Sequence, residues 1–141
     1  MLDPLDLAER GEAAIADAMT WAAANVKAGP VMIYASAPPD AVKAVQAKLG
    51  RDRAGTVVEH ALAALGQALV KQGVRRLVVA GGESSGAVVQ ALGVRALRIG
   101  PQIDPGIPAT VSLGEPPLAL ALKSGNFGAE DFFLKAIEKL R

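Results

Sequence analysis

The chain has 141 residues, the usual length of one domain. Hydrophobic residues make up 51% of it and charged residues 21%, and 15 basic residues nearly balance 14 acidic ones. This composition excludes a disordered chain, and the net charge of +1 argues against binding to nucleic acid or to an anionic membrane. The absence of cysteine and the single histidine exclude disulfides, thiol nucleophiles and two-histidine metal sites within these residues.

The organisation of the chain is expected to be simple. No run of about 18 consecutive apolar residues is present, so no membrane-spanning helix is predicted. The N-terminus, Met1-Leu2-Asp3-Pro4, is acidic where a secretory signal would be basic, which favours a cytoplasmic location. No linker or internal repeat divides the sequence, and residues 1–141 are expected to form a single domain.

The N-terminal half is predicted to be mainly helical. Apolar residues spaced by three or four from Ile15 to Val26 indicate a helix that ends near Gly29-Pro30. The run 31–35, Val-Met-Ile-Tyr-Ala, is short, apolar and partly β-branched, and it predicts a buried strand. Two further helices are expected, over 41–49 and 55–71.

The C-terminal half alternates between predicted strands and helices. Strands are expected over 75–80, 96–99, 110–113 (at an edge) and 118–122. Helices are expected over 86–92 and from Glu130 to the C-terminus. The segment 100–108 contains three prolines, which lack backbone donors, and it is expected to be a loop. This alternation predicts an α/β fold, a three-layer sandwich with a mostly parallel sheet.

Two glycine-containing turns follow predicted strands, where α/β proteins commonly bind ligands. The first is Gly81-Gly82-Glu83-Ser84-Ser85-Gly86, whose glycines permit close approach of a ligand and whose helix N-terminus favours an anion such as phosphate. Any tight turn between a strand and a helix also needs glycine and a capping residue, so a purely structural role remains an alternative. The segment matches neither of the standard glycine-rich phosphate-binding patterns.

The second turn is Lys123-Ser124-Gly125-Asn126-Phe127-Gly128. Its cation, hydroxyl, amide and glycines suit a nucleotide. In the alternative interpretation Lys123 is a solvated strand end and Asn126 adopts a left-handed backbone conformation.

Other polar residues give weaker indications. Asp104 is a candidate to orient a substrate or a metal ion, although Asp before Pro is common in ordinary turns. His60 lies beside the apolar stripe of a predicted helix, where a surface role is favoured over catalysis. No serine, histidine and aspartate set is apparent, and no catalytic or metal-binding residue is assigned.

Four ordered segments resemble the C-terminal nucleotide-binding domain of the four-carbon acid sugar kinases, which include 3-oxo-tetronate, threonate and erythronate kinases. They are Leu77–Gly86, Ile99–Pro108, Leu120–Gly128 and Asp131-Phe132-Phe133, which together span most of the chain. Ser84 stands where the family more often has threonine, and Gln102 where it often has glutamate.

This resemblance implies an ATP-binding domain that acts with Mg²⁺. It assigns cofactor-binding roles to Gly81, Gly82, Glu83, Ser84, Gly125 and Asn126. Family members carry an N-terminal domain that binds the sugar acid and supplies the catalytic base. These residues include no such domain, so the chain is expected to be inactive alone and to meet its sugar acid through a separate domain or chain. The alternative is a non-catalytic interaction or oligomerisation module, and self-association of the chain is plausible under either interpretation.

Overall fold

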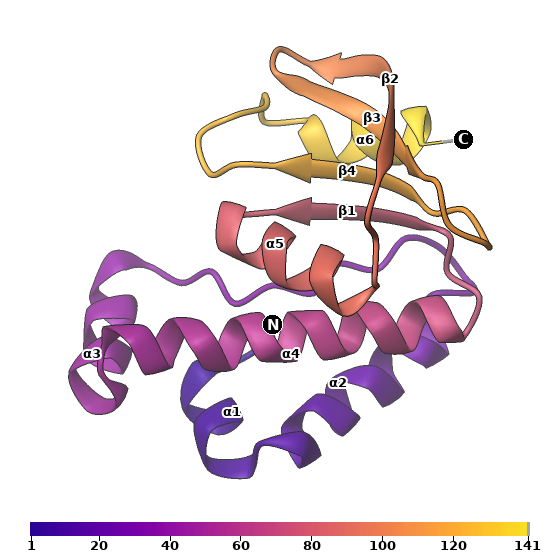
Figure 1. Ribbon diagram of the computed structural model, residues 1–141. Helices are drawn as coiled ribbons and strands as arrows, with labels where there is room; N and C mark the ends of the chain where they lie inside the picture. Colours follow the sequence, from indigo (N-terminus) through magenta and orange to yellow (C-terminus); the bar gives the residue numbers. More distant parts are fainter. Residues whose placement is uncertain (141) are drawn as a thin grey trace.

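The computed structural model describes residues 1–140, which form an α/β fold around one four-stranded sheet (Figure 1). The strands are β1 (Arg76–Ala80), β2 (Leu97–Asp104), β3 (Ile107–Ser112) and β4 (Ala119–Lys123). Their order in the sheet is β1-β4-β3-β2. The pair β1–β4 is parallel, whereas β4–β3 and β3–β2 are antiparallel. The predicted α/β class is confirmed, but the sheet is mixed rather than mostly parallel.

The antiparallel pairing arises from the proline-rich segment that was expected to be a loop. Residues 100–104 extend β2, residues 107 and 108 begin β3, and Pro105-Gly106 forms the two-residue turn between them. Gly106 has φ 78°, a conformation that glycine adopts without strain. Pro101 has no backbone N–H to donate. It is tolerated because β2 is an edge strand, which has a neighbouring strand on one side only. Consequently β3, expected at an edge, lies inside the sheet.

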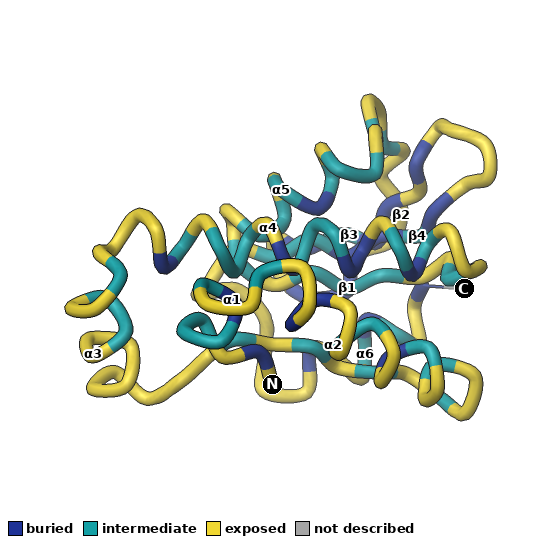
Figure 2. The backbone as a smooth tube through the Cα atoms, turned by 90° about the horizontal axis from the view of Figure 1, so that it is seen from below, coloured by how far each residue is buried: buried dark blue, intermediate teal, exposed yellow. Residues whose placement is uncertain are grey.

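Helices α5 (Gly82–Ala91) and α6 (Phe132–Lys139) lie on opposite faces of the sheet (Figures 1 and 2). The core between α6 and the sheet is apolar, and its buried members are Ile103, Ile107, Ala109, Ala121, Phe132, Ala136 and Leu140. On the other face, α5 contacts β1 and β4. The three predicted layers are therefore present.

A group of four helices lies along the side of the sheet bounded by β1, as Figure 1 shows. They are α1 (Pro4–Arg10), α2 (Glu12–Asn25), α3 (Pro39–Leu49) and α4 (Arg51–Lys71). Leu7, Ile15, Ala61 and Leu65 form the centre of the core shared by α1, α2 and α4, whereas α3 has no buried residue. Gly66 allows α5 to approach α4 closely, because a Cβ at this position would lie 3.3 Å from Val88 Cγ1. Among residues 1–140 no helix has the length and apolar character needed to cross a membrane.

The predicted strand at 31–35 is not formed. This segment has no regular secondary structure, although the Leu2 N–H donates a hydrogen bond of 2.7 Å to the Tyr34 carbonyl. The side chains of Met32 and Tyr34 are 53% and 44% exposed. Helix boundaries differ as well: α4 begins at Arg51 instead of residue 55, and α5 begins at Gly82 instead of residue 86.

Candidate nucleotide site

The two glycine-containing turns lie side by side because β1 and β4 are adjacent parallel strands. The Gly81 N–H donates a hydrogen bond of 2.8 Å to the Lys123 carbonyl, which extends the β1–β4 ladder to the ends of both strands. Parallel strands place their carboxyl ends at the same edge of the sheet. The structure therefore brings together into one surface two turns whose first residues, Gly81 and Lys123, lie 42 positions apart in the sequence.

The first turn leads directly into α5 with an open N-terminus. Gly81 is the N-cap with φ 111° and ψ 130°, and no side chain caps this end of the helix. The Ser85 N–H donates to the Gly81 carbonyl at 2.9 Å, and a Cβ at Gly81 would lie 3.4 Å from Ser84 Oγ. The backbone N–H groups of residues 82–84 come before this first helical hydrogen bond, and they point out of the N-terminal end of α5. Free N–H groups and the helix dipole make such an end favourable for an anion.

Three glycines of the two turns have no structural requirement for glycine. Gly82, Gly86 and Gly125 lie outside the positive-φ region, and a Cβ at any of them would meet no atom within 4 Å. Gly82 and Gly86 lie within α5, where glycine costs roughly 0.5–1 kcal/mol relative to alanine. Gly29 and Gly114 share the open space at the Cβ position and the lack of a positive φ, but only Gly82, Gly86 and Gly125 lie in or beside the two strand-end turns, where this space leaves the backbone open to a ligand.

The second turn is organised by Lys123. Its Nζ donates to the carbonyls of Ser124 and Gly125, at 3.2 and 3.0 Å, and lies 5.9 Å from the centre of the Phe132 ring. The cation is therefore held within the turn and is not a solvated strand end. Asn126 is exposed, and its φ is not positive, which excludes the left-handed conformation considered from sequence. The turn thus presents a fixed cation, exposed backbone and a free amide side chain.

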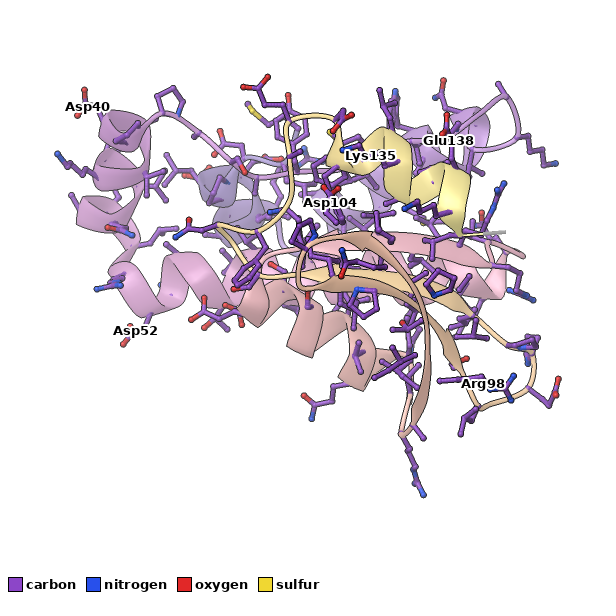
Figure 3. All side chains as sticks on the ribbon, turned by 90° about the horizontal axis from the view of Figure 1, so that it is seen from above. Asp40, Asp52, Arg98, Asp104, Lys135 and Glu138 are labelled. Atoms are coloured by element: carbon purple, nitrogen blue, oxygen red, sulfur yellow. The ribbon has the colours of Figure 1, made fainter. Side chains whose placement is uncertain are left out.

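Asp104 holds the far side of this turn. Its carboxylate accepts the Ala129 N–H through Oδ2 at 2.9 Å and Lys135 Nζ through Oδ1 at 3.3 Å. Lys135 also pairs with Asp131 at 2.7 Å. Figure 3 shows Asp104 and Lys135 beside each other. Because Asp104 is only 7% exposed and both of its oxygens are engaged, its role is to join segments of the protein.

The electrostatic state of this cluster follows from these contacts. The Ala129 hydrogen bond lowers the pKa of Asp104 most strongly, burial opposes the change by raising it, and Lys135 lowers it further. Conversely, hydrogen bonds from Lys135 to Asp131 and Asp104 raise the pKa of Lys135. Both groups are held in their charged forms at neutral pH.

A pH dependence of stability follows. The folded-state pKa of Asp104 lies below that of the unfolded chain, so its contribution is present above about pH 4 and is lost as the pH falls through the folded value. We expect the wild-type chain to be more stable than Asp104→Asn at pH 7, and the difference to narrow below about pH 4. Urea denaturation at several pH values measures this. A difference that stayed constant down to pH 2 would contradict the assignment.

The predicted site residues gather at this surface. Gly81, Gly82, Glu83 and Ser84 form the first turn and the start of α5, and Gly125 and Asn126 lie in the second turn. Gly86 and Lys123 lie in the two predicted turns but were not assigned cofactor-binding roles, and Asp104 was considered only as a candidate to orient a substrate or a metal ion. The glycine at position 86 and the lysine at the end of a predicted strand can both be read from the sequence. The contact between Asp104 and Ala129 joins distant segments and can be found only from the fold. His60 lies elsewhere, 3.3 Å from Glu12 and largely exposed.

No group of three or more histidine or acidic side chains that could hold a metal ion occurs within residues 1–140. The free backbone N–H groups at the start of α5 and the cation of Lys123 suit phosphate oxygens instead, although Glu83 in the same turn carries a negative charge. Lys123 and the first-turn amides of α5 are donors that a phosphate accepts from. Open space at the three glycines leaves room for such a group to approach the backbone.

The fold is α/β, and its two glycine-containing turns lie at the carboxyl ends of adjacent parallel strands, where proteins of this class commonly bind ligands. A family model described as the nucleotide-binding C-terminal domain matches residues 1–133. The chain belongs to this family.

Several of its curated relatives carry the name 3-oxo-tetronate kinase. The chain is 62% identical over 139 residues to a 3-oxo-tetronate kinase of Cupriavidus necator and 60% identical to one of Pseudomonas savastanoi. Each alignment covers 99% of this chain and 32% of the relative. The crystal structure of a Haemophilus influenzae protein has a TM-score of 0.83 with 43% identity, covering 90% of this chain and 31% of that one. The chain thus spans about a third of the length of these relatives.

Proposed function

We propose that this chain is the ATP-binding domain of a kinase that phosphorylates a four-carbon sugar acid of the tetronate or 3-oxo-tetronate type. The observation that carries the proposal is the hydrogen-bonded junction of the two turns, with three sterically unnecessary glycines around it. Relatives named 3-oxo-tetronate kinase support the kind of reaction.

In this proposal the first-turn amides of α5 bind phosphate oxygens, and Ser84 adds a hydroxyl donor beside them. Lys123 provides positive charge next to the phosphates, and Gly125 and Asn126 border the remainder of the nucleotide. Mg²⁺ arrives with the nucleotide and neutralises phosphate charge during transfer. Phosphoryl transfer depends largely on positioning and charge neutralisation, which are the two properties that these residues offer.

The acceptor hydroxyl and its base are assigned to the portion of the relatives that this chain does not span. We expect the 141 residues alone to bind nucleotide weakly and to catalyse the reaction poorly. We also propose a cytoplasmic location for the protein. A groove between the 31–37 segment and α6 is lined by exposed apolar side chains, among them Met32, Tyr34 and Leu134. Because exposed apolar surface favours association, we expect the isolated chain to self-associate.

Titration of the isotope-labelled chain with ATP and Mg²⁺, followed by amide chemical shifts, tests the proposal. We expect saturable shifts at residues 81–86 and 123–128. Amides of α3 serve as an internal control and should not move. Titration with inorganic phosphate separates a general anion effect from nucleotide recognition.

Absence of any shift at millimolar ATP would contradict nucleotide binding by this chain. The remaining function would then be the interaction module, in which the turns serve only to connect strands and helices. Shifts of equal size with phosphate and with ATP would contradict recognition of the nucleoside.

A further inference from the structure

The tip of the β2–β3 hairpin contacts the second glycine-containing turn at two independent points. Asp104 accepts the Ala129 N–H at 2.9 Å, as described above. Two residues later, a Cβ at Gly106 would lie 3.1 Å from Cδ1 and Cε1 of Phe127, so the phenyl ring rests against the hairpin at this position. The contacts therefore fix the side chain of Phe127 within the turn and the backbone N–H of Ala129, the residue that directly follows the turn.

Apart from these contacts and the hydrogen bonds from Lys123 Nζ to the Ser124 and Gly125 carbonyls, the turn has few restraints on its outer side. Residues 124–130 are all exposed, and Phe127 is 52% exposed despite its contact with Gly106. Two backbone hydrogen bonds hold the turn internally, from the Phe127 N–H to the Ser124 carbonyl at 3.3 Å and from the Phe132 N–H to the Ala129 carbonyl at 3.0 Å. Exposed backbone with few bonds tends to open locally. The hydrogen bond that the Ala129 N–H donates to Asp104 therefore has a large influence on the position of the turn.

Asp104 is suited to this task because it is itself held in place. It is buried at the end of β2, opposite Ile107 in the register of the hairpin. Lys135 of α6 neutralises it, and Lys139 of the same helix donates to the carbonyls of Gln102 and Ile103 at 2.8 and 3.3 Å. These contacts tie the end of β2 to α6, as the pair of Asp104 and Lys135 in Figure 3 illustrates. The carboxylate is thus a rigid acceptor.

We propose that Asp104 is a positioning residue for the nucleotide site: it holds the 124–129 turn against the hairpin tip in the conformation that binds nucleotide, without touching the nucleotide itself. The proposal rests on the function proposed above. It assigns a task to the Gly-Pro-Gln-Ile-Asp-Pro-Gly segment, which the two turns alone leave unexplained. Within residues 1–140, Asp104 belongs to no group of three or more histidine or acidic side chains that could hold a metal ion.

The test combines ligand-free amide exchange with calorimetric titration of ATP and Mg²⁺. In Asp104→Ala we expect the Ala129 amide to exchange at least about tenfold faster and the dissociation constant to rise at least about fivefold. Asp104→Asn retains an oxygen acceptor and should recover most of both properties. Lys135→Met removes the cation but leaves the Ala129 acceptor, and both properties should change less than they do in Asp104→Ala.

A matched variant separates positioning from general loss of stability. Leu7 is buried in α1, far from both turns, and Leu7→Ala should lower the denaturation midpoint while leaving the dissociation constant unchanged. If Asp104→Ala and Leu7→Ala weakened binding equally, the effect would be global and the positioning role would be wrong. Unchanged Ala129 exchange in Asp104→Ala would overturn it as well.

The two proposals fail in different ways. If the wild type binds ATP and Asp104→Ala binds it equally well, the positioning role alone is overturned. If the wild type binds no ATP, the proposed function falls and the positioning role falls with it. In that case the ligand-free exchange still decides whether Asp104 fixes the turn.

Discussion

Gly82→Val is expected to weaken binding of ATP with Mg²⁺ by at least about tenfold while changing the free energy of unfolding by less than about 1 kcal/mol. A Cβ at Gly82 would meet no protein atom within 4 Å, and Gly82 is an exposed residue of the first turn of α5. The added isopropyl group therefore fits the fold, but it fills the space through which a phosphate would approach the helix amides. Calorimetric titration and urea denaturation measure the two quantities.

Gly114→Val is the matched control. Gly114 also lacks a positive φ and also has open space at its Cβ, but it lies in the β3–β4 connection at the opposite end of β4. This variant should bind as the wild type does. Equal affinity in Gly82→Val and the wild type would count against the first turn as a phosphate site.

Phe132→Ala is expected to lower the free energy of unfolding by about 3–5 kcal/mol, the usual cost of removing a buried phenyl ring. Phe132 is 1% exposed and lies in the core between α6 and the sheet. Its ring also supports the second turn, because a Cβ at Gly128 would lie 3.1–3.2 Å from Phe132 atoms. Urea denaturation followed by circular dichroism provides the measurement.

The neighbouring Phe133 offers a comparison at the same helix end. It is 36% exposed and contacts Phe132 edge to face, with ring centres 5.6 Å apart. Phe133→Ala should cost about 1 kcal/mol or less. Similar losses in both variants would mean that burial does not distinguish the two rings and that the core lies elsewhere.

The sequence was a good guide wherever the signal is local. Both turns, most helices and the strands β1 and β4 could be located from apolar spacing and from glycines at strand ends, and the family resemblance is confirmed by the relatives. Strand order depends on contacts between distant segments. The adjacency of β1 and β4, which places Gly81 beside Lys123, therefore could not be derived from spacing.

The two errors in element type have a common origin. Residues 31–35 have the composition of a strand, but a strand also needs a neighbouring strand with free backbone groups, and in the structure this segment has only the hydrogen bond from the Leu2 N–H to the Tyr34 carbonyl. Conversely, the prolines of 100–108 suggested a loop, yet they occur on an edge strand, at a turn and beside register shifts, where a missing N–H is tolerated. Composition describes a residue's preference, whereas pairing is a property of the whole sheet.

The hydrogen bond between the Gly81 N–H and the Lys123 carbonyl makes the site preorganised. It fixes the two turns one strand spacing apart, about 4.8 Å, as part of the sheet ladder and before any ligand is present. The conformational entropy of bringing the two loops together is thus lost during folding, and a ligand that bridges them does not lose it again on binding. The proposed nucleotide affinity of this surface is consequently expected to depend on the integrity of the β1–β4 pairing.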